Sequence, residues 1–202
     1  MTDMELSRAP TGCGTSSGHF SETVKMEAAH AMIDASSAIL LTKAGAMEAC
    51  CQAFRIKMTR RVFEEVTVAD RPGERRLRAL EGKVAGFAVV EDPTGPLPDR
   101  AAADLLRLHP GERDTLHHFL NGSARFVILD DGKGVQVCRR HAIPHINALL
   151  CPKILHHSER LPDAQQVRSL FDRIAGLGRY SKDVLAWARQ CRRSDLEFFL
   201  NQ

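Results

Sequence analysis

The feature that most constrains this chain is a short apolar run that ends abruptly in two acids. Phe126–Leu129 holds four apolar residues, and Asp130, Asp131 and Gly132 follow directly. A continuous apolar run bounded by turn residues is typical of a strand buried on both faces of a parallel sheet. Ligands of such sheets bind outside the carboxyl ends of the strands. The two acids are therefore expected at a ligand-binding edge.

The same pattern occurs near the start of the chain. Ala31–Ile33 is apolar, Asp34 follows it, and then come Ser36 and Ser37, either of which could cap a helix. Because the carboxyl ends of parallel strands meet at one edge, two strand ends would deliver acids to the same rim.

Strand-like and helix-like segments alternate along the rest of the chain. The expected strands are 30–34, 55–58, 84–90, 126–129 and 143–146. The expected helices lie near 46–53, after Thr59, within 70–83, over 100–108, from Glu112, over 133–141, over 163–175 with Gly176 and Gly178 as its stop, and after Ser181. Such alternation predicts an α/β fold with a mostly parallel sheet.

The 202 residues are ample for one domain and short for two. We expect a flexible leader over residues 1–27 and a single domain over 28–202. No stretch approaches a membrane span, and the leader lacks the apolar block of a signal peptide. The six cysteines include no C-x-x-C pair, so we interpret them as reduced thiols of a cytoplasmic protein.

The net charge of +3 argues little by itself, but basic residues cluster at 55–61, 71–78 and 133–140. Such clusters can contact phosphates, and each can equally be a solvated helix face. On the helix after Thr59, helical spacing puts Glu65 at the border of the apolar stripe and turns Glu64 away from it. On the helix starting at Glu112, that residue shares the apolar face with Leu116, whereas Asp114 faces the opposite way.

These acids can do chemistry only together. Several carboxylates on one rim repel one another unless a cation neutralises them. Oxygen ligands without Cys or His favour Mg²⁺ or Mn²⁺, which can activate water against a phosphodiester. Taken singly, each acid has a structural explanation: Asp34 as a helix cap, Asp130 and Asp131 as an Asp-Gly turn, Glu65 as a solvated helix residue and Glu112 as a charge at a helix start.

Four segments in order resemble the PIN domain family, in the branch related to VapC-type toxin ribonucleases: IDASSAILLTKAGAME, TRRVFEEV, PGERDTLHHF and VILDDGKGVQVCRRHAIP. The resemblance covers about residues 30–150. It implies a three-layer α/β/α sandwich with a central, mostly parallel sheet. It also implies a Mg²⁺- or Mn²⁺-dependent endoribonuclease, which as the toxin of a toxin–antitoxin pair would have RNA as substrate and an antitoxin and a second copy of the chain as partners.

Carried over by position, the resemblance makes Asp34, Glu65, Glu112 and Asp131 catalytic and metal-binding, with Asp130 as a further metal ligand. Ser36 matches a family serine, and with Lys133 and Arg139 it is expected to contact the RNA.

The chain also departs from the family pattern. Gly132 replaces an arginine, Gly134-Val135 replaces an Ala-Arg step, and Asn147–Leu150 replaces Gly-Thr-Leu-Gly. These changes leave open a second function, a PIN-like module that binds RNA or protein without cutting. A phosphatase of the haloacid dehalogenase type is a weaker alternative, since it needs D-x-D where this chain has Asp34-Ala-Ser.

Overall fold

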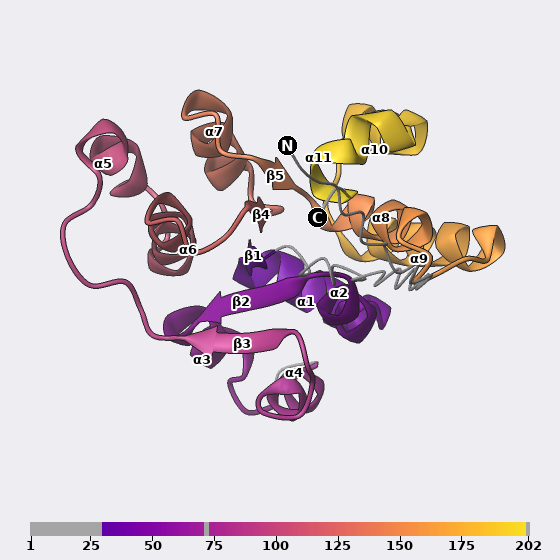
Figure 1. Cartoon of the computed structure of the whole chain (residues 1–202), viewed down its shortest axis with the longest axis horizontal. Helices are drawn as coiled ribbons and strands as arrows, with labels where there is room; N and C mark the ends of the chain where they lie inside the picture. Colours follow the sequence, from indigo (N-terminus) through magenta and orange to yellow (C-terminus); the bar gives the residue numbers. More distant parts are fainter. Residues whose placement is uncertain (1–29, 71–72, 201–202) are drawn as a thin grey trace, which may run out of the picture.

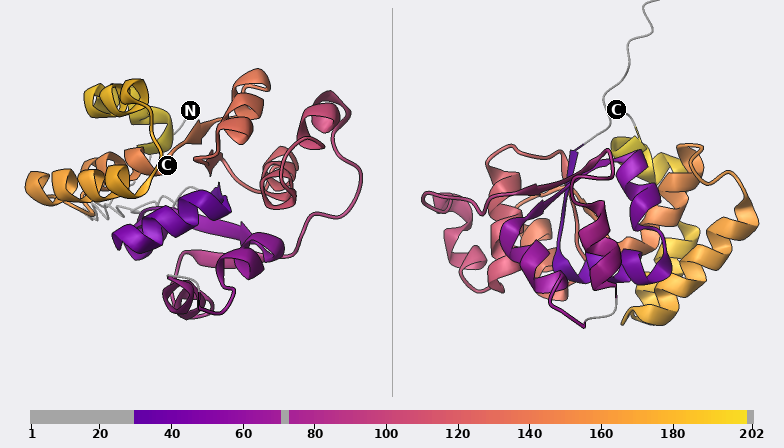
Figure 2. Two further views of the ribbon diagram at one scale, coloured as in Figure 1. Left: turned by 180° about the vertical axis from the view of Figure 1, so that it is seen from behind. Right: turned by 90° about the horizontal axis from the view of Figure 1, so that it is seen from below.

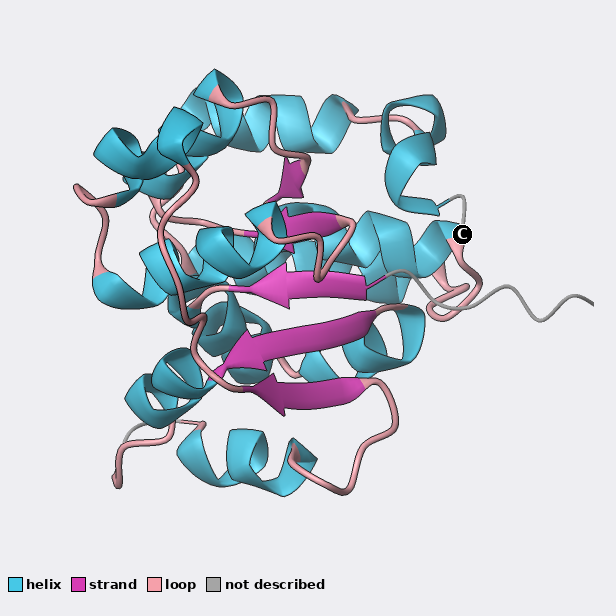
Figure 3. Ribbon diagram, turned by 60° about the vertical axis from the view of Figure 1, so that its left-hand side comes forward, coloured by secondary structure: helices cyan, strands magenta, loops and turns pink. Residues whose placement is uncertain are grey.

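The centre of the molecule is a five-stranded sheet. The computed structural model describes residues 30–70 and 73–200. The strand order is β3-β2-β1-β4-β5 and every neighbouring pair is parallel, as the arrows in Figure 3 show. The strands are β1 (His30–Ile33), β2 (Arg55–Thr59), β3 (Phe87–Val90), β4 (Phe126–Ile128) and β5 (His145–Ile146). Ile33 pairs with Ile128, so β1 and β4 end side by side and bring the acids that follow them to one edge.

Helices cover both faces of this sheet (Figures 1 and 2). They are α1 (Ala35–Ala44), α2 (Met47–Ala53), α3 (Arg60–Val66), α4 (Glu74–Leu80), α5 (Asp99–Leu105), α6 (Pro110–Leu120), α7 (Gly132–Arg140), α8 (Cys151–His157), α9 (Ala164–Leu177), α10 (Lys182–Gln190) and α11 (Glu197–Leu200). Two 3-10 turns, η1 (Ala148–Leu150) and η2 (Arg193–Leu196), complete the described elements.

Alternate residues of the central strands enter two separate cores. Ile33 and Ile128 join the larger core with α1–α4 and α8–α10, whereas Met32 and Val127 join a second core with α5, α6 and α7. Burial on both faces explains why these strands are continuously apolar in sequence. The expected three-layer α/β/α sandwich with a parallel sheet is therefore confirmed.

Strands β1 and β4 each end one residue earlier than expected, and two other expected strands are shortened more, for local backbone reasons. The strand expected over 84–90 begins at Phe87, because Gly86 has a φ of 93°, outside the extended region. A Cβ at Gly86 would lie 2.1 Å from the carbonyl oxygen of Cys51, so only glycine fits there. The strand expected over 143–146 is reduced to β5, since Pro144 has no N–H to donate to a sheet ladder.

Helix ends also differ from expectation. Gly176 does not stop α9, which continues to Leu177 and is capped by Gly178. A single glycine inside a helix costs about 1 kcal/mol, which a well-packed helix tolerates. The helix expected over 100–108 is α5, and it ends at Leu105. The expected leader over 1–27 lies outside the described residues. Within the described residues, no helix combines the length and apolarity needed to cross a membrane.

Candidate active site at the acidic rim

Asp34 stands between the end of β1 and the start of α1. It is the N-cap of α1, and its Oδ1 accepts a hydrogen bond from the backbone N–H of Ser37 at 2.8 Å. The Ser36 hydroxyl donates to Oδ2 at 2.5 Å. The expectation that Ser36 or Ser37 caps the helix is therefore wrong, because the extended residue before the first helical position is Asp34. Its carboxyl is buried, with 1% of its surface exposed.

Glu112 and Asp131 each occupy the N-terminal turn of another helix. Glu112 is the third residue of α6, and its Oε2 accepts from the backbone N–H of His109 at 3.3 Å. Asp131 is the N-cap of α7, where its Oδ1 accepts from the N–H of Lys133 at 2.8 Å. The positive end of a helix dipole favours a negative side chain at both positions. Capping therefore accounts for how these acids are held.

Capping does not account for their closeness to one another. Burial, then the charge of Asp131 and a hydrogen bond with it, raise the pKa of Glu112 to about 7, and the charge of Asp34 adds to this. Burial raises the pKa of Asp34 to about 6, although hydrogen bonds from Ser36 and Ser37 oppose the rise. Among the described residues, none of these three carboxylates forms an ion pair with Lys, Arg or His. We call Asp34, Glu112 and Asp131 the acidic rim.

Asp130 has a different environment from its neighbour Asp131. Its Oδ2 accepts from the Ser37 hydroxyl at 2.7 Å and from the backbone N–H of Ala148 at 3.0 Å, and its Oδ1 accepts from the Tyr180 hydroxyl at 2.5 Å. Burial raises the pKa of Asp130, and these hydrogen bonds oppose the rise. The carboxylate thus ties the end of β4 to α1, η1 and the segment before α10. The altered residues at Asn147–Leu150 still supply one of its donors.

Glu65 lies beside the start of α6. A Cβ placed on Gly111 would come within 3.3 Å of Glu65 Oε2, and Gly111 directly precedes Glu112 in the chain. The side chain of Glu65 is exposed, on a helix whose Val62, Phe63 and Val66 are buried. Glu65 Oε2 therefore lies near the start of α6, and its membership of the acidic rim stays a prediction.

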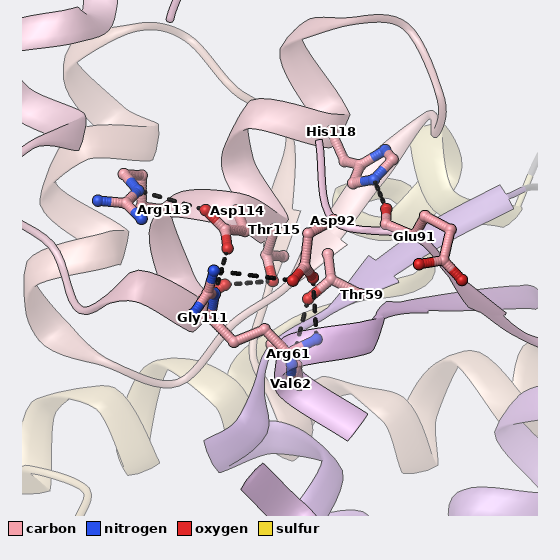
Figure 4. Close-up of polar contacts among 10 residues, drawn as sticks. All are labelled: Thr59, Arg61, Val62, Glu91, Asp92, Gly111, Arg113, Asp114, Thr115 and His118. Carbon is pink, nitrogen blue, oxygen red and sulfur yellow. Dashed lines mark hydrogen bonds and ion pairs between the residues drawn. The ribbon is translucent and has the colours of Figure 1, made fainter. Parts of the chain in front are cut away.

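Sequence analysis missed the ion-pair cluster that holds α3 against α6. Figure 4 shows Arg61 reaching from α3 toward Asp114 on α6 and toward Asp92. Arg61 Nε donates to Asp114 Oδ2 at 2.6 Å, and Arg113 Nε donates to Oδ1 at 3.2 Å. The backbone N–H of Arg61 donates to Asp92 Oδ1 at 2.8 Å. Because α3 carries Glu65 and α6 carries Glu112, this cluster fixes the two helices that present these acids.

In the sequence, the one indication of this cluster was that Asp114 lies outside the apolar face of α6. Asp114 does face away from the Glu112 side, but it is buried against Arg61, which lies 53 residues earlier. Other bonds drawn in Figure 4 brace the same region: Thr115 donates to the Gly111 carbonyl at 2.8 Å, and His118 Nε2 donates to the Glu91 carbonyl at 2.6 Å.

The three expected substrate contacts occupy different settings. The Ser36 hydroxyl donates its hydrogen bond to the Asp34 carboxylate. Lys133 is exposed in the first turn of α7, and Arg139 is exposed in its last turn. Gly134 between them is buried, and a Cβ there would lie 2.8 Å from Leu129 Cδ2. This lack of space explains why residue 134 is a glycine. The charged groups of Lys133 and Arg139 remain exposed to solvent.

The acidic rim fits a hard cation by its chemistry. Within the described residues, no three Asp, Glu, His or Cys side chains are grouped so as to hold a metal ion as they stand. The rim nevertheless gathers carboxylate oxygens alone, and their burial and mutual charge raise pKa values that a divalent cation would lower. Asp34, Glu112 and Asp131 are therefore the residues that would hold Mg²⁺ or Mn²⁺, and a part for Glu65 stays a prediction.

Comparison with known proteins gives one match. A family model described as DUF3368, a PIN domain, matches residues 30–190, from the start of β1 to the end of α10. No curated protein and no solved structure matches the chain significantly. The matched segment holds every acid of the candidate site.

Proposed function

This chain is a member of the PIN domain family, a nuclease-type fold, and we propose that it is a Mg²⁺- or Mn²⁺-dependent endoribonuclease that hydrolyses RNA phosphodiester bonds. The observation that carries the proposal is the meeting of Asp34, Glu112 and Asp131 at the carboxyl edge of a parallel sheet. Three buried or half-buried carboxylates without a basic partner are costly for a fold and are typical of a functional site.

The residues of the chain would divide the work. Asp34 is held in one orientation by its bonds from Ser36 and Ser37, so it offers a fixed ligand. Asp131 and Glu112 each accept one backbone hydrogen bond at a helix start and would supply further oxygen ligands. When bound, Mg²⁺ or Mn²⁺ supplies a water of lowered pKa and positive charge beside the phosphate. Lys133 and Arg139 would hold the RNA backbone nearby.

Cleavage of a labelled single-stranded RNA tests the proposal. We expect hydrolysis with millimolar Mn²⁺, none with EDTA, and a large loss in Asp34→Asn. The matched control is Asp163→Asn, because Asp163 is also an N-cap, accepting from the N–H of Gln165 at 2.8 Å, but it caps α9. Cleavage that persists in EDTA in nuclease-free protein, or equal losses in the two variants, would overturn the proposal.

A second candidate function is a PIN-like module that binds RNA or protein without cutting it. The substitutions at Gly132 and Asn147–Leu150 favour it, because they change residues next to the acids. Binding of the same RNA without Mn²⁺-dependent cleavage would establish this candidate. A toxin role, an antitoxin partner and a homodimer rest on the family resemblance alone and stay predictions.

A further inference from the structure

A groove of about 400 Å³ adjoins the acidic rim. It runs between α7, β5 and α10, and Figure 1 shows α7 and α10 on either side of β5. Asp130 and Gly132 line it, so it opens next to Asp131, which lies between them. Its size falls in the range of about 300–1,000 Å³ that small-ligand sites occupy. We call it the basic groove because two arginines and a histidine line it. These are Arg139, Arg179 and His145, and the aromatic residues Tyr180 and Trp187 lie beside them in the lining.

Trp187 is the most unusual member of this lining. It lies on α10 with 55% of its surface exposed, although tryptophan is usually well buried. In the described part of the chain its indole contacts neither another aromatic ring nor a guanidinium. The groove therefore presents a flat aromatic face that the fold itself does not use.

Two arginines of the groove are also unused by the fold. The guanidinium groups of Arg139 and Arg179 make no hydrogen bond or ion pair with any described residue, whereas Arg140, next to Arg139 in α7, bonds Asp104. Asp130 is the only acid lining the groove among the described residues, and its oxygens already accept three hydrogen bonds. Among its lining residues the groove thus offers positive charge without a free carboxylate, and Asp131 lies at its edge.

We propose that the basic groove binds a single-stranded segment of RNA, with a base stacked on Trp187 and backbone phosphates on Arg139 and Arg179. Aromatic faces beside a positively charged track are how proteins hold single-stranded nucleic acid. A duplex cannot use this site, since its bases are stacked inside the helix. The inference rests on the proposed ribonuclease function and deepens it, because a strand lying in the groove passes directly beside Asp131.

The only tryptophan of the chain makes this groove directly observable. The sequence holds one tryptophan and one tyrosine, so red-edge excitation reports Trp187 alone. We would titrate the full chain, in EDTA to prevent cleavage, with a mixed-sequence single-stranded RNA and with its blunt duplex. The expected result is saturable quenching by the single strand at a dissociation constant about tenfold or more below that of the duplex.

Variants separate stacking from general charge. Arg139→Ala and Arg179→Ala should each weaken binding and each reduce the slope of log K against log salt by about 0.7, the value for one phosphate of a single strand. Arg168→Ala is the matched control, because Arg168 is an exposed arginine of α9 outside the groove. Trp187→Leu, measured with labelled RNA, should lose about tenfold in affinity, and Trp187→Phe should recover part of it. Since Trp187 is exposed, both variants should keep the wild-type melting temperature.

The outcomes distinguish the groove from the nuclease. Quenching by single-stranded RNA that Mn²⁺ does not cleave would support the groove and refute the ribonuclease. Mn²⁺-dependent cleavage without quenching, unaffected by Trp187→Leu, would support the ribonuclease and overturn the groove. Equal effects of Arg139→Ala, Arg179→Ala and Arg168→Ala would overturn it as well. Quenching by polyglutamate but not by RNA would assign the groove to an acidic protein instead.

Discussion

Helix α6 carries two acids, two positions apart, that the fold treats in opposite ways. Asp114 is buried between the guanidinium groups of Arg61 and Arg113, at 2.6 and 3.2 Å. Glu112 is half-buried near Asp131 and Asp34, and burial first, then the charges of these two acids, raise its pKa to about 7. A buried carboxylate matched by guanidinium groups ties elements together. A half-buried carboxylate whose neighbours are other carboxylates makes the metal-free fold less stable, and such carboxylates are typical of functional sites.

The largest effect is expected when the charge of Glu112 or of Asp114 is removed. Glu112→Gln should reduce Mn²⁺-dependent RNA hydrolysis on the order of 10²–10³-fold, the loss expected when a positioned electrostatic group is removed. Asp114→Asn should reduce it only a few-fold at temperatures where the variant is folded. Its cost should appear in the free energy of unfolding, about 1–3 kcal/mol for hydrogen bonds to charged groups. That value is below the one for a fully buried pair, because Arg61 is 48% exposed.

Initial rates and urea unfolding curves of both variants check this prediction. Similar losses of activity, together with similar losses of stability, would mean that Glu112 and Asp114 are both structural and would break the comparison.

The next largest effect is expected at the two neighbouring glutamates of α3, Glu64 and Glu65. Glu65→Gln should lower activity by about 10–100-fold, as removal of a group supporting a metal site does, because Glu65 Oε2 borders Gly111 at the start of α6. Glu64→Gln should be nearly silent. Both residues are exposed, and substitutions at exposed positions usually change the free energy of unfolding by at most about 0.5 kcal/mol. The reverse order of activities would show that the acidic rim does not extend to this helix face.

Metal binding should separate the two regions by stability alone. Mn²⁺ at about 100 times its dissociation constant should stabilise the wild type by about 2.7 kcal/mol, because it binds only the folded site. Asp34→Asn should gain much less, whereas Asp114→Asn should gain as much as the wild type. In EDTA, Asp34→Asn should melt at or above the wild-type temperature, since asparagine caps a helix as well as aspartate and removes a repelling charge. Melting curves with EDTA and with Mn²⁺ measure all three proteins. Equal Mn²⁺ shifts in all of them would mean that Asp34 is only a cap.

The smallest expected effect is a pH dependence of the metal-free protein. The folded pKa of Asp34 is raised from 3.8 to about 6. The stabilisation this represents is fully present below the unfolded pKa and is lost as the pH rises through the folded pKa. Between pH 5 and 7 the wild type in EDTA should therefore lose about 1 kcal/mol more stability than Asp34→Asn. Chemical unfolding at several pH values measures the difference. Parallel pH profiles for the two proteins would show that burial does not raise the pKa of Asp34 in the folded protein.

Local sequence patterns were enough to predict much of this fold. Apolar runs identified the central strands, and turn residues placed Asp34 and Asp131 at strand ends. The predictions failed where one backbone conformation decides the outcome. Gly86 adopts a positive φ against Cys51 and delays β3, and a sequence pattern does not show this close approach.

Distant contacts decided what each acid does. Asp130 and Asp131 form one sequence pattern, yet Asp130 is bonded by Ser37 and by Tyr180, which are 93 and 50 residues away. Asp131 instead lies near Glu112. Periodicity and turn chemistry depend on a few adjacent residues, so the sequence by itself determined the parallel sheet and the edge at which its acids gather. Whether a carboxylate meets a hydroxyl, a guanidinium or another carboxylate depends on how separate helices pack, and only the tertiary structure decided that.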